Sequence, residues 1–384
     1  MNTSKPRLSS EAALFSFDYP PNDGGISRLC AEIVRAMRRR VAKVKVLTQT
    51  ASTDVTERDG VYEVRLPNTR PTREWQAFRW LRQNPPDGPL VCGTWYPEGL
   101  IAMMAGIRPL VILAHGSELM PAAARWRRPL WRAMLRRVCE SADLVVANSG
   151  YTSKLVLAGA PKARVAAIPL GVDHLRFSPE GRERARQSFE LHNELVISSV
   201  SRVHAYKGHE VVFEAIAGLP KRIRKDIVYL LAGKGPYEMA LRARAEELGI
   251  PSNLRWLGFV SDTDLPNVYR ASDLFVLCTR EAVAGQHVEG FGLVFLEAQA
   301  CGTPVVGTRT GGIPDAVCEG EGGWLIAQDD AEELGRILLN LAGDPAAFHL
   351  AGLAGRRRIE RECTWLHYTE RFITVLKSHG IPLV

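Results

Sequence analysis

Short, uninterrupted apolar runs recur along the whole chain and alternate with segments of helical periodicity. In the first half the runs are 12–17, 44–48, 90–94, 110–115, 144–148 and 165–169, and in the second half they are 196–200, 228–232, 254–257, 274–278, 304–306 and 324–326. Runs without polar alternation are typical of parallel strands, because helices cover both faces of such sheets. The two sets therefore predict an α/β protein with two Rossmann-like, doubly wound parallel-sheet domains.

A Gly- and Pro-containing stretch at 170–179 separates the two sets of runs. Such stretches are typical of domain boundaries, so we expect domains over 1–171 and 172–364. Ligands of open α/β sheets bind beyond the carboxyl ends of the strands. We therefore expect an inter-domain cleft that holds the functional site.

The composition limits the kinds of partner and compartment. The net charge is +7 over 384 residues, which suits phosphate groups, anionic lipid or nucleic acid. The sequence contains no uninterrupted apolar stretch of about 18 residues, so we expect no transmembrane helix. The first residues lack a signal-peptide pattern. The seven cysteines form no Cys-x-x-Cys pair. We therefore expect neither a disulfide framework nor a zinc site, and a cytoplasmic location.

The most specific motif is Glu-Gly-Phe-Gly-Leu-x-x-x-Glu-Ala at 289–298, followed by Cys-Gly-x-Pro at 301–304. Glycines at a helix start let backbone N–H groups approach a phosphate, which the helix dipole also favours. Glu297, expected two turns into the helix, suits the hydroxyls of a ribose. An ordinary helix with an acidic residue before it explains the same letters, so the spacing of Glu289 and Glu297 alone is weak evidence.

Two cations and several glycines follow predicted strands. Arg202 and Lys207 lie in the first strand–helix loop of the second domain, where they suit a diphosphate, although solvated loop cations are an equal alternative. Gly24 and Gly25 open the first helix of the chain and allow close approach of a ligand, or only a turn. Neither domain has Gly-x-Gly-x-x-Gly after its first strand, which argues against a nicotinamide or flavin enzyme.

Two features of the first domain have both a functional and a structural interpretation. His115 ends an apolar run beside Gly116, so it either faces a cleft or is a structural histidine. Arginines interleave with Trp and Leu over Arg125–Arg137. This segment predicts an amphipathic helix that either lies on an anionic membrane or packs its apolar side inward, and the second alternative is the commoner.

The order of these motifs over residues 17–324 resembles that of the retaining glycosyltransferases of GT-B architecture in glycosyltransferase family 4. The resemblance implies transfer of a hexose-type sugar from a nucleotide-diphosphate sugar, which would be a UDP-sugar or a GDP-sugar. The acceptor would be a sugar, a lipid-linked precursor or another small molecule. The resemblance also implies that a C-terminal helix within 365–384 returns to the first domain.

The resemblance assigns each candidate residue a role. Arg202 and Lys207 would hold the diphosphate, with Gly24 and Gly25 nearby, and Glu297 would bind the ribose. The catalytic residues would be His115 beside the sugar and Glu289 facing it. Backbone contacts to phosphate or sugar would come from Gly290, Phe291, Gly292 and Leu293.

No cofactor, metal or nucleic-acid partner is expected. The letters Asp-x-Asp occur only at 262–264, where they indicate a helix cap. Protein cations would replace a metal in stabilising the nucleoside-diphosphate leaving group. The segment 280–288 is longer than in many relatives and suits a substrate-specific loop. Two alternatives remain: a nucleotide-sugar epimerase of the same architecture, and a non-catalytic protein that binds anions or, peripherally, a membrane.

Overall fold

The computed structural model describes residues 11–22, 24–49, 55–58, 60–120, 127–281, 288–381 and 383. The chain forms two compact units, an N-terminal unit of Met1–Leu170 with Leu366–Val384 and a C-terminal unit of Gly171–Trp365. The boundaries expected from the sequence, at 171/172 and 364/365, differ from these by one residue. Each unit has its own sheet and its own core.

The N-terminal unit is built on an eight-stranded sheet of order β3-β4-β2-β1-β5-β6-β7-β8. The strands are β1 (Glu11–Phe15), β2 (Lys43–Gln49), β3 (Val55–Arg58), β4 (Val61–Leu66), β5 (Leu90–Cys92), β6 (Leu110–Ala114), β7 (Leu144–Ala147) and β8 (Val165–Ala167). Only β3 is antiparallel to its neighbour in this sheet. The six apolar runs correspond to β1, β2 and β5–β8, whereas the sequence pattern missed β3 and β4.

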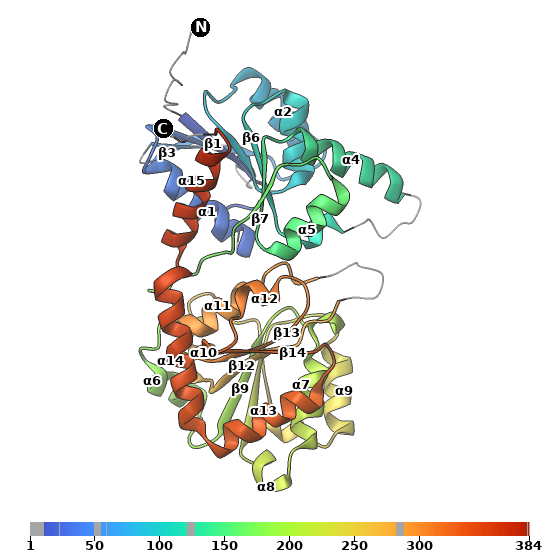
Figure 1. Cartoon of the computed structure of the whole chain (residues 1–384), viewed down its shortest axis with the longest axis vertical. Helices are drawn as coiled ribbons and strands as arrows, with labels where there is room; N and C mark the ends of the chain where they lie inside the picture. Colours follow the sequence, from blue (N-terminus) through green and yellow to red (C-terminus); the bar gives the residue numbers. More distant parts are fainter. Residues whose placement is uncertain are drawn as a thin grey trace. The chain divides into compact units, whose positions relative to one another are not determined.

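Helices cover both faces of this sheet (Figure 1). They are α1 (Gly25–Arg38), α2 (Thr72–Gln83), α3 (Leu100–Ala105), α4 (Arg128–Ser141), α5 (Gly150–Gly159) and α15 (Trp365–Ser378), with a π-helical turn at Trp95–Gly99. Side chains of α2, α3, α4 and α5 form one core cluster with alternate residues of the strands. Helix α15 belongs to this unit, as expected, and buries Tyr368, Phe372 and Leu376 there.

The C-terminal unit has a six-stranded parallel sheet of order β11-β10-β9-β12-β13-β14. The strands are β9 (Leu195–Val200), β10 (Ile227–Ala232), β11 (Leu254–Gly258), β12 (Leu274–Leu277), β13 (Val305–Thr308) and β14 (Gly323–Ile326). The helices are α6 (Arg182–Ser188), α7 (His209–Gly218), α8 (Lys221–Arg224), α9 (Glu238–Glu247), α10 (Leu265–Ala271), α11 (Leu293–Ala300), α12 (Ile313–Ala316), α13 (Ala331–Gly343) and α14 (Pro345–Glu362).

Successive strand residues in this sheet enter different cores, which is why the runs are apolar throughout. Ile197 and Tyr229 pack against α7, α9 and α13 on one face, whereas Val196 and Leu230 pack with α6 and α10 on the other. The β9–α7, β10–α9, β12–α11 and β13–α12 loops all leave the carboxyl edge of the sheet, because the strands are parallel. Each sheet therefore presents one edge with convergent loops.

Within the described segments, no single helix combines the length and apolar content needed to cross a membrane. Only the pair α13 and α14, taken together across a bend of 107°, reaches that combination.

Candidate functional site

The loop after β9 carries two of the predicted cations and is packed without slack. Gly208, with φ of 69°, precedes α7, and a Cβ there would lie 1.8 Å from the Cys278 carbonyl oxygen. On its other side the loop meets the turn after β10, where the Val203 N–H donates to the Lys234 carbonyl at 3.0 Å. A Cβ on Gly233 would lie 1.8 Å from the Ser201 carbonyl oxygen. The backbone of the loop between Ser201 and Lys207 is therefore held in one conformation by these contacts.

A buried polar chain ties this loop to the sheet through His209, the first residue of α7. His209 Nε2 lies 3.1 Å from Ser201 Oγ, and Nδ1 lies 3.0 Å from the Tyr229 hydroxyl. Tyr229 donates to Ser199 Oγ at 2.6 Å, and Ser199 donates to the Val276 carbonyl. Since the Tyr229 proton is committed to Ser199, Nδ1 carries the imidazole proton and Nε2 is an acceptor beside the Ser201 hydroxyl, which also lies 3.2 Å from the Arg202 carbonyl oxygen. Burial, with Lys207 nearby, lowers the pKa of His209 to about 3.

The two cations differ in their surroundings. Arg202 is exposed and makes no side-chain hydrogen bond or ion pair with another described residue, so its guanidinium is available to a ligand. Lys207 is buried to 9% exposure, and its Nζ lies 2.6 Å from Glu289 Oε2. An ammonium group has three donors, so Lys207 can bind Glu289 and a phosphate oxygen together. The structure thus brings two predicted site residues into direct contact.

The backbone of Glu289 is held by the loop after β13. The Gly312 N–H donates to the Glu289 carbonyl at 2.8 Å. Gly311 has a φ of 55°, and a Cβ there would lie 2.4 Å from the same carbonyl oxygen. Glu289 is therefore fixed from both ends, by this hydrogen bond and by the ion pair to Lys207.

The glycine turn after Glu289 leads directly into α11, as the sequence predicted. Gly292 precedes the helix with φ of 90°, and Leu293 is its first residue. A Cβ on Gly292 would lie 2.6 Å from the Phe295 ring, so the turn packs onto the ring. The first backbone N–H groups of the eight-residue helix α11 thus lie at the carboxyl edge, where Arg202 and Lys207 also lie.

Glu297 lies closer to the start of α11 than expected. It is the fifth residue of α11, little more than one turn from the helix start, so the expected two turns were wrong. Its side chain is 3% exposed, and Oε2 accepts a hydrogen bond of 2.8 Å from the Tyr269 hydroxyl. Tyr269 therefore orients this carboxylate.

The N-terminal unit holds the other predicted residues, at the carboxyl edge of its own sheet. His115 follows β6, and its Nε2 lies 2.7 Å from the Gly93 carbonyl oxygen. A carbonyl only accepts, so Nε2 carries the proton and Nδ1 of neutral His115 is an acceptor. The His115 N–H also donates to Glu118 Oε1 at 2.6 Å. The ring and its backbone are therefore fixed.

Gly24 and Gly25 lie at the start of α1 with open space around them. No atom lies within 4 Å of a Cβ built at either position, and Gly24 has a φ of 147°. No neighbouring atom requires glycine at these positions, and the open space would let a ligand approach. The positive φ of Gly24 is also explained by a turn without a ligand.

Polar residues that sequence reasoning missed surround the carboxyl edges. Asn148, after β7, donates to the His115 carbonyl at 3.1 Å, while its buried Oδ1 has no partner within the described residues. Lys234 is exposed after β10, the neighbour of β9. Lys234 lies in a Gly-Lys-Gly-Pro turn that follows a strand, a signal that could have marked it as a third cation of the edge.

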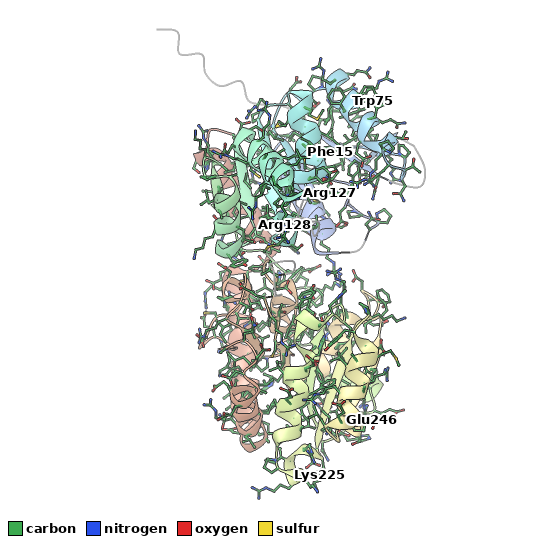
Figure 2. All side chains as sticks on the ribbon, turned by 90° about the vertical axis from the view of Figure 1, so that its right-hand side faces the viewer. Phe15, Trp75, Arg127, Arg128, Lys225 and Glu246 are labelled. Atoms are coloured by element: carbon green, nitrogen blue, oxygen red, sulfur yellow. The ribbon has the colours of Figure 1, made fainter. Side chains whose placement is uncertain are left out.

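The helix of the basic segment begins at Arg128, and Arg125 and Trp126 lie outside the described residues. Leu135 and Val138 pack inward from α4, whereas Leu130 is 75% exposed. Figure 2 marks Arg127 and Arg128 in the N-terminal unit. The extended segment at 280–288 also lies largely outside the described residues.

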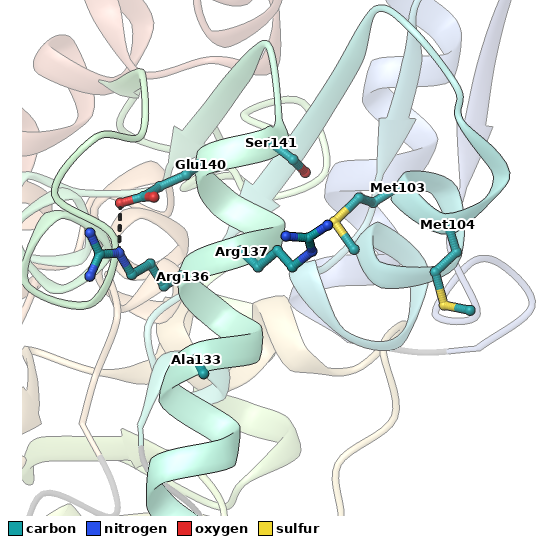
Figure 3. Close-up of a pocket in the computed structure, with 7 residues that line it drawn as sticks. All are labelled: Met103, Met104, Ala133, Arg136, Arg137, Glu140 and Ser141. Carbon is teal, nitrogen blue, oxygen red and sulfur yellow. Dashed lines mark hydrogen bonds and ion pairs between the residues drawn. The ribbon is translucent and has the colours of Figure 1, made fainter.

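A cavity of about 780 Å³ lies between α3 and α4 (Figure 3). Met103 and Met104 line it from α3, with Met104 60% exposed, and Arg136 and Arg137 line it from α4. Arg136 Nε donates to Glu140 Oε1 at 3.1 Å. This face therefore combines exposed apolar side chains with positive charge.

Among the residues that the structure describes, no three His, Cys, Asp or Glu side chains are grouped as a metal site.

Two family profiles together match most of the chain. The profile described as Glycosyltransferase Family 4 matches residues 23–176, and the profile described as Glycosyl transferases group 1 matches residues 181–358.

Two curated relatives match over nearly their whole length. The chain is 31% identical to the GDP-mannose-dependent alpha-(1-6)-phosphatidylinositol monomannoside mannosyltransferase of Mycolicibacterium smegmatis, over 89% of this chain and 92% of that protein. It is 31% identical to the D-inositol 3-phosphate glycosyltransferase of Actinosynnema mirum, over 88% and 90%. Among solved structures, Anabaena HepE in complex with UDP aligns with a TM-score of 0.77 at 19% identity, over 96% of this chain and all of that one.

Proposed function

Because this chain belongs to glycosyltransferase family 4 and has the GT-B fold, we propose that it transfers mannose from GDP-mannose to a phosphatidylinositol-type lipid, with retention of anomeric configuration. The Lys207–Glu289 ion pair carries the proposal, because it stands beside the glycine turn of α11 in a chain 31% identical to a GDP-mannose-dependent transferase. The same fold hosts many activities, so the donor and acceptor rest on the relatives together with the site.

The chemistry of the C-terminal edge suits a nucleoside-diphosphate leaving group. Negative charge grows on the diphosphate as the bond to the sugar breaks. In our proposal the Arg202 guanidinium takes two phosphate oxygens as a planar fork, Lys207 supplies a point charge, and the α11 backbone N–H groups complete the site. Lys207 and the backbone of its loop are already fixed by the contacts of Glu289, Gly208 and Gly312, so little reorganisation of this cation is needed during transfer.

Two carboxylates and a histidine take the remaining roles. Glu289, held by Lys207, would face the mannosyl group, and Glu297, oriented by Tyr269, would accept the ribose hydroxyls. His115 Nδ1 would accept a hydrogen bond from the sugar or acceptor. No metal is required in this arrangement, because protein cations neutralise the diphosphate.

The lipid acceptor is favoured over a soluble one by the surface of α4. Its arginines, with the exposed Leu130 and Met104, suit an anionic bilayer surface, where each cation contributes about 1 kcal/mol. The second candidate acceptor is free inositol phosphate, because the Actinosynnema mirum relative is named for that acceptor. Both acceptors contain a phosphorylated inositol.

Membrane binding through α4 is tested by sedimentation with vesicles. We expect recovery with anionic vesicles to exceed that with neutral ones and to fall with salt. Replacing Arg132, Arg136 and Arg137 by Gln should abolish the difference, whereas Lys221→Gln with Arg222→Gln on α8 is a control of similar exposure. Equal recovery of wild type on both vesicle types would refute membrane docking.

The activity is tested with GDP-mannose and phosphatidylinositol, phosphatidylinositol monomannoside or inositol phosphate as separate acceptors. We expect mannosylated lipid whose anomeric carbon keeps the α configuration of the donor. Transfer only to inositol phosphate would replace the lipid acceptor by the second candidate. Interconversion of free donor epimers without transfer would replace the transferase by an epimerase.

A further inference from the structure

Glu98 is a buried carboxyl group of the N-terminal unit that the proposed chemistry does not use. It lies in the π-helical turn Trp95–Gly99 after β5 and is 3% exposed. Its Oε1 accepts a hydrogen bond of 3.0 Å from the Phe17 N–H, and its Oε2 lies 2.6 Å from Thr94 Oγ1. Phe17 follows β1 and Thr94 follows β5, so this one side chain joins the loops that leave two neighbouring strands.

The contacts of Thr94 indicate where the proton of this carboxyl group lies. Thr94 has one hydroxyl proton, and its Oγ1 lies 2.8 Å from the Tyr96 carbonyl oxygen as well as 2.6 Å from Glu98 Oε2. A carbonyl oxygen can only accept a hydrogen bond, and the same is true of an ionised carboxylate. Both contacts are hydrogen bonds if Thr94 donates to Tyr96 and accepts from a protonated Glu98. An ionised Glu98 would leave one of the two contacts without a proton.

The surroundings of Glu98 also favour the neutral acid. Burial raises the pKa of this carboxyl, although its hydrogen bonds and the Arg73 charge act in the opposite direction. Arg73, a cation that lies near it on α2, is itself bound to Glu74 at 3.3 Å. Cys30 of α1 and Cys92 of β5 also lie near Glu98, and burial raises the pKa of both thiols, so they remain uncharged.

The two loops that Glu98 joins support the ring of His115. A Cβ on Gly93 would lie 2.3 Å from Ser16 Oγ, so the loops after β1 and β5 are in close contact. The Gly93 carbonyl accepts the hydrogen bond of 2.7 Å from His115 Nε2, which leaves Nδ1 as the acceptor. Glu98 binds the residue that follows Gly93 in the chain and the residue that follows Ser16.

Packing alone does not account for a carboxyl group at this position. An apolar side chain of similar size would fill the same space without the cost of burying a polar group. A carboxylic acid accepts one hydrogen bond and donates another, so it fixes the two loops relative to each other, which an apolar side chain cannot do.

We propose that Glu98 is a neutral carboxylic acid and a positioning residue, which locks the loops after β1 and β5 together and thereby holds His115 in the tautomer that the transfer uses. The part of this inference that concerns transfer rests on the proposed function, which gives His115 its role. The protonation of Glu98 rests on the contacts of Thr94 and Phe17.

The protonation is tested with Glu98→Gln, because a glutamine amide donates and accepts at the same places as the neutral acid. An unfolded glutamate has a pKa of about 4.3, so above this pH unfolding releases a proton that the folded wild type retains. Stability should therefore fall as the pH rises, and only in a protein that has the acid. Hydrogen exchange of peptides that cover β1 and β5, corrected for intrinsic rates, measures this opening.

From pH 5.5 to 7.5 we expect the opening equilibrium to increase at least tenfold more in the wild type than in Glu98→Gln, since one proton changes it by about tenfold per pH unit. Other titrating groups are common to both proteins and cancel in the comparison. Glu370→Gln, which replaces an exposed carboxylate on α15 of the same unit, is the matched control and should keep the wild-type pH dependence.

The positioning role is tested with Glu98→Leu, which keeps the bulk and removes both hydrogen bonds. ¹⁵N NMR of the histidine rings, with His115 assigned by its absence in His115→Ala, should show the Nε2-protonated tautomer in the wild type and in Glu98→Gln, and a mixture of tautomers in Glu98→Leu. Thr94→Val removes only the Thr94 contact and should shift the tautomers in the same direction, which provides a second variant if Glu98→Leu does not fold.

Transfer kinetics separate this role from a loss of the whole site. At pH 7.5 kcat should fall at least tenfold in Glu98→Leu and stay within twofold of the wild type in Glu98→Gln. The affinity for GDP should stay within twofold in both proteins, because the residues proposed to bind it belong to the C-terminal unit.

Two results would overturn the inference. Equal pH dependence of opening in the wild type and Glu98→Gln would exclude the neutral acid. An unchanged His115 tautomer in Glu98→Leu and Thr94→Val, whatever the activity, would exclude positioning. Hydrogen exchange and NMR need no substrate, so absence of mannosyl transfer by the wild type would reject the proposed function and leave both of these results in force.

Discussion

Lowering the pH from 7.5 to 5.0 should destabilise the C-terminal unit through His209. Burial holds this imidazole neutral by lowering its pKa to about 3, whereas an unfolded histidine has a pKa near 6.5. Below pH 6.5 the unfolded chain therefore binds a proton that the folded chain does not. The free energy of unfolding falls as the pH falls, by about 1.4 kcal/mol per unit until the folded pKa is reached.

Between pH 7.5 and 5.0 these two pKa values predict a loss of about 2 kcal/mol. His209 is 2% exposed, so solvent does not screen this effect. The loss should appear around Ser201, Tyr229 and Ser199, which the imidazole joins. Hydrogen exchange read by mass spectrometry, corrected for intrinsic rates, gives the opening free energy of peptides that cover β9, α7 and β10.

His209→Gln provides the reference, because its side chain hydrogen-bonds but does not titrate. We expect it to be less stable at pH 7.5 and to lose about 2 kcal/mol less than the wild type on acidification. Other titrating groups are common to both proteins and cancel in the difference. Equal pH slopes in the two proteins would refute the neutral, buried His209 and with it the polar chain that fixes the loop.

The remaining predictions concern the proposed chemistry. Arg202→Ala and Lys207→Ala should each weaken GDP binding by about 10- to 100-fold, the range for one charge-assisted hydrogen bond, in calorimetric titrations where the exposed Arg222→Ala leaves it unchanged. Unaltered affinity in both would remove the diphosphate site. Glu289→Gln and His115→Ala should lower kcat by about 10²-fold in steady-state transfer, with folding checked by circular dichroism. Near wild-type kcat in both would exclude them from the reaction. Glu297→Gln should raise the donor KM more than it lowers kcat, and the reverse pattern would contradict ribose binding.

The apolar runs predicted twelve of the strands, and all twelve runs overlap a strand. Strands such as β10 and β12 bury every residue and leave no polar alternation in the sequence, whereas β8 and β11 are only partly buried. Strand β4 was missed because only Leu66 of its six residues is fully buried and Glu63 and Arg65 interrupt the pattern. Strand β3 is a short antiparallel edge strand, which parallel-sheet reasoning does not anticipate.

Sequence order identified the candidate loops but not the contacts between them. Arg202 and Lys207 were named because they follow a strand, and Glu289 because it precedes the glycine turn of a helix. The carboxyl edge of a parallel sheet does collect such residues. The Lys207–Glu289 ion pair joins residues 82 apart, and the Gly312–Glu289 hydrogen bond depends on the backbone of the β13–α12 loop. Long-range partners of this kind leave no local pattern in a single sequence.

The most direct test of the proposed function is transfer of radiolabelled mannose from GDP-mannose to phosphatidylinositol monomannoside by the purified wild-type protein, with UDP-glucose as the competing donor. We predict label in the lipid fraction, joined through an α linkage, and its loss in the Lys207→Ala protein. Label that stays with water-soluble products, a β linkage, or transfer from UDP-glucose but not from GDP-mannose would contradict the proposed function.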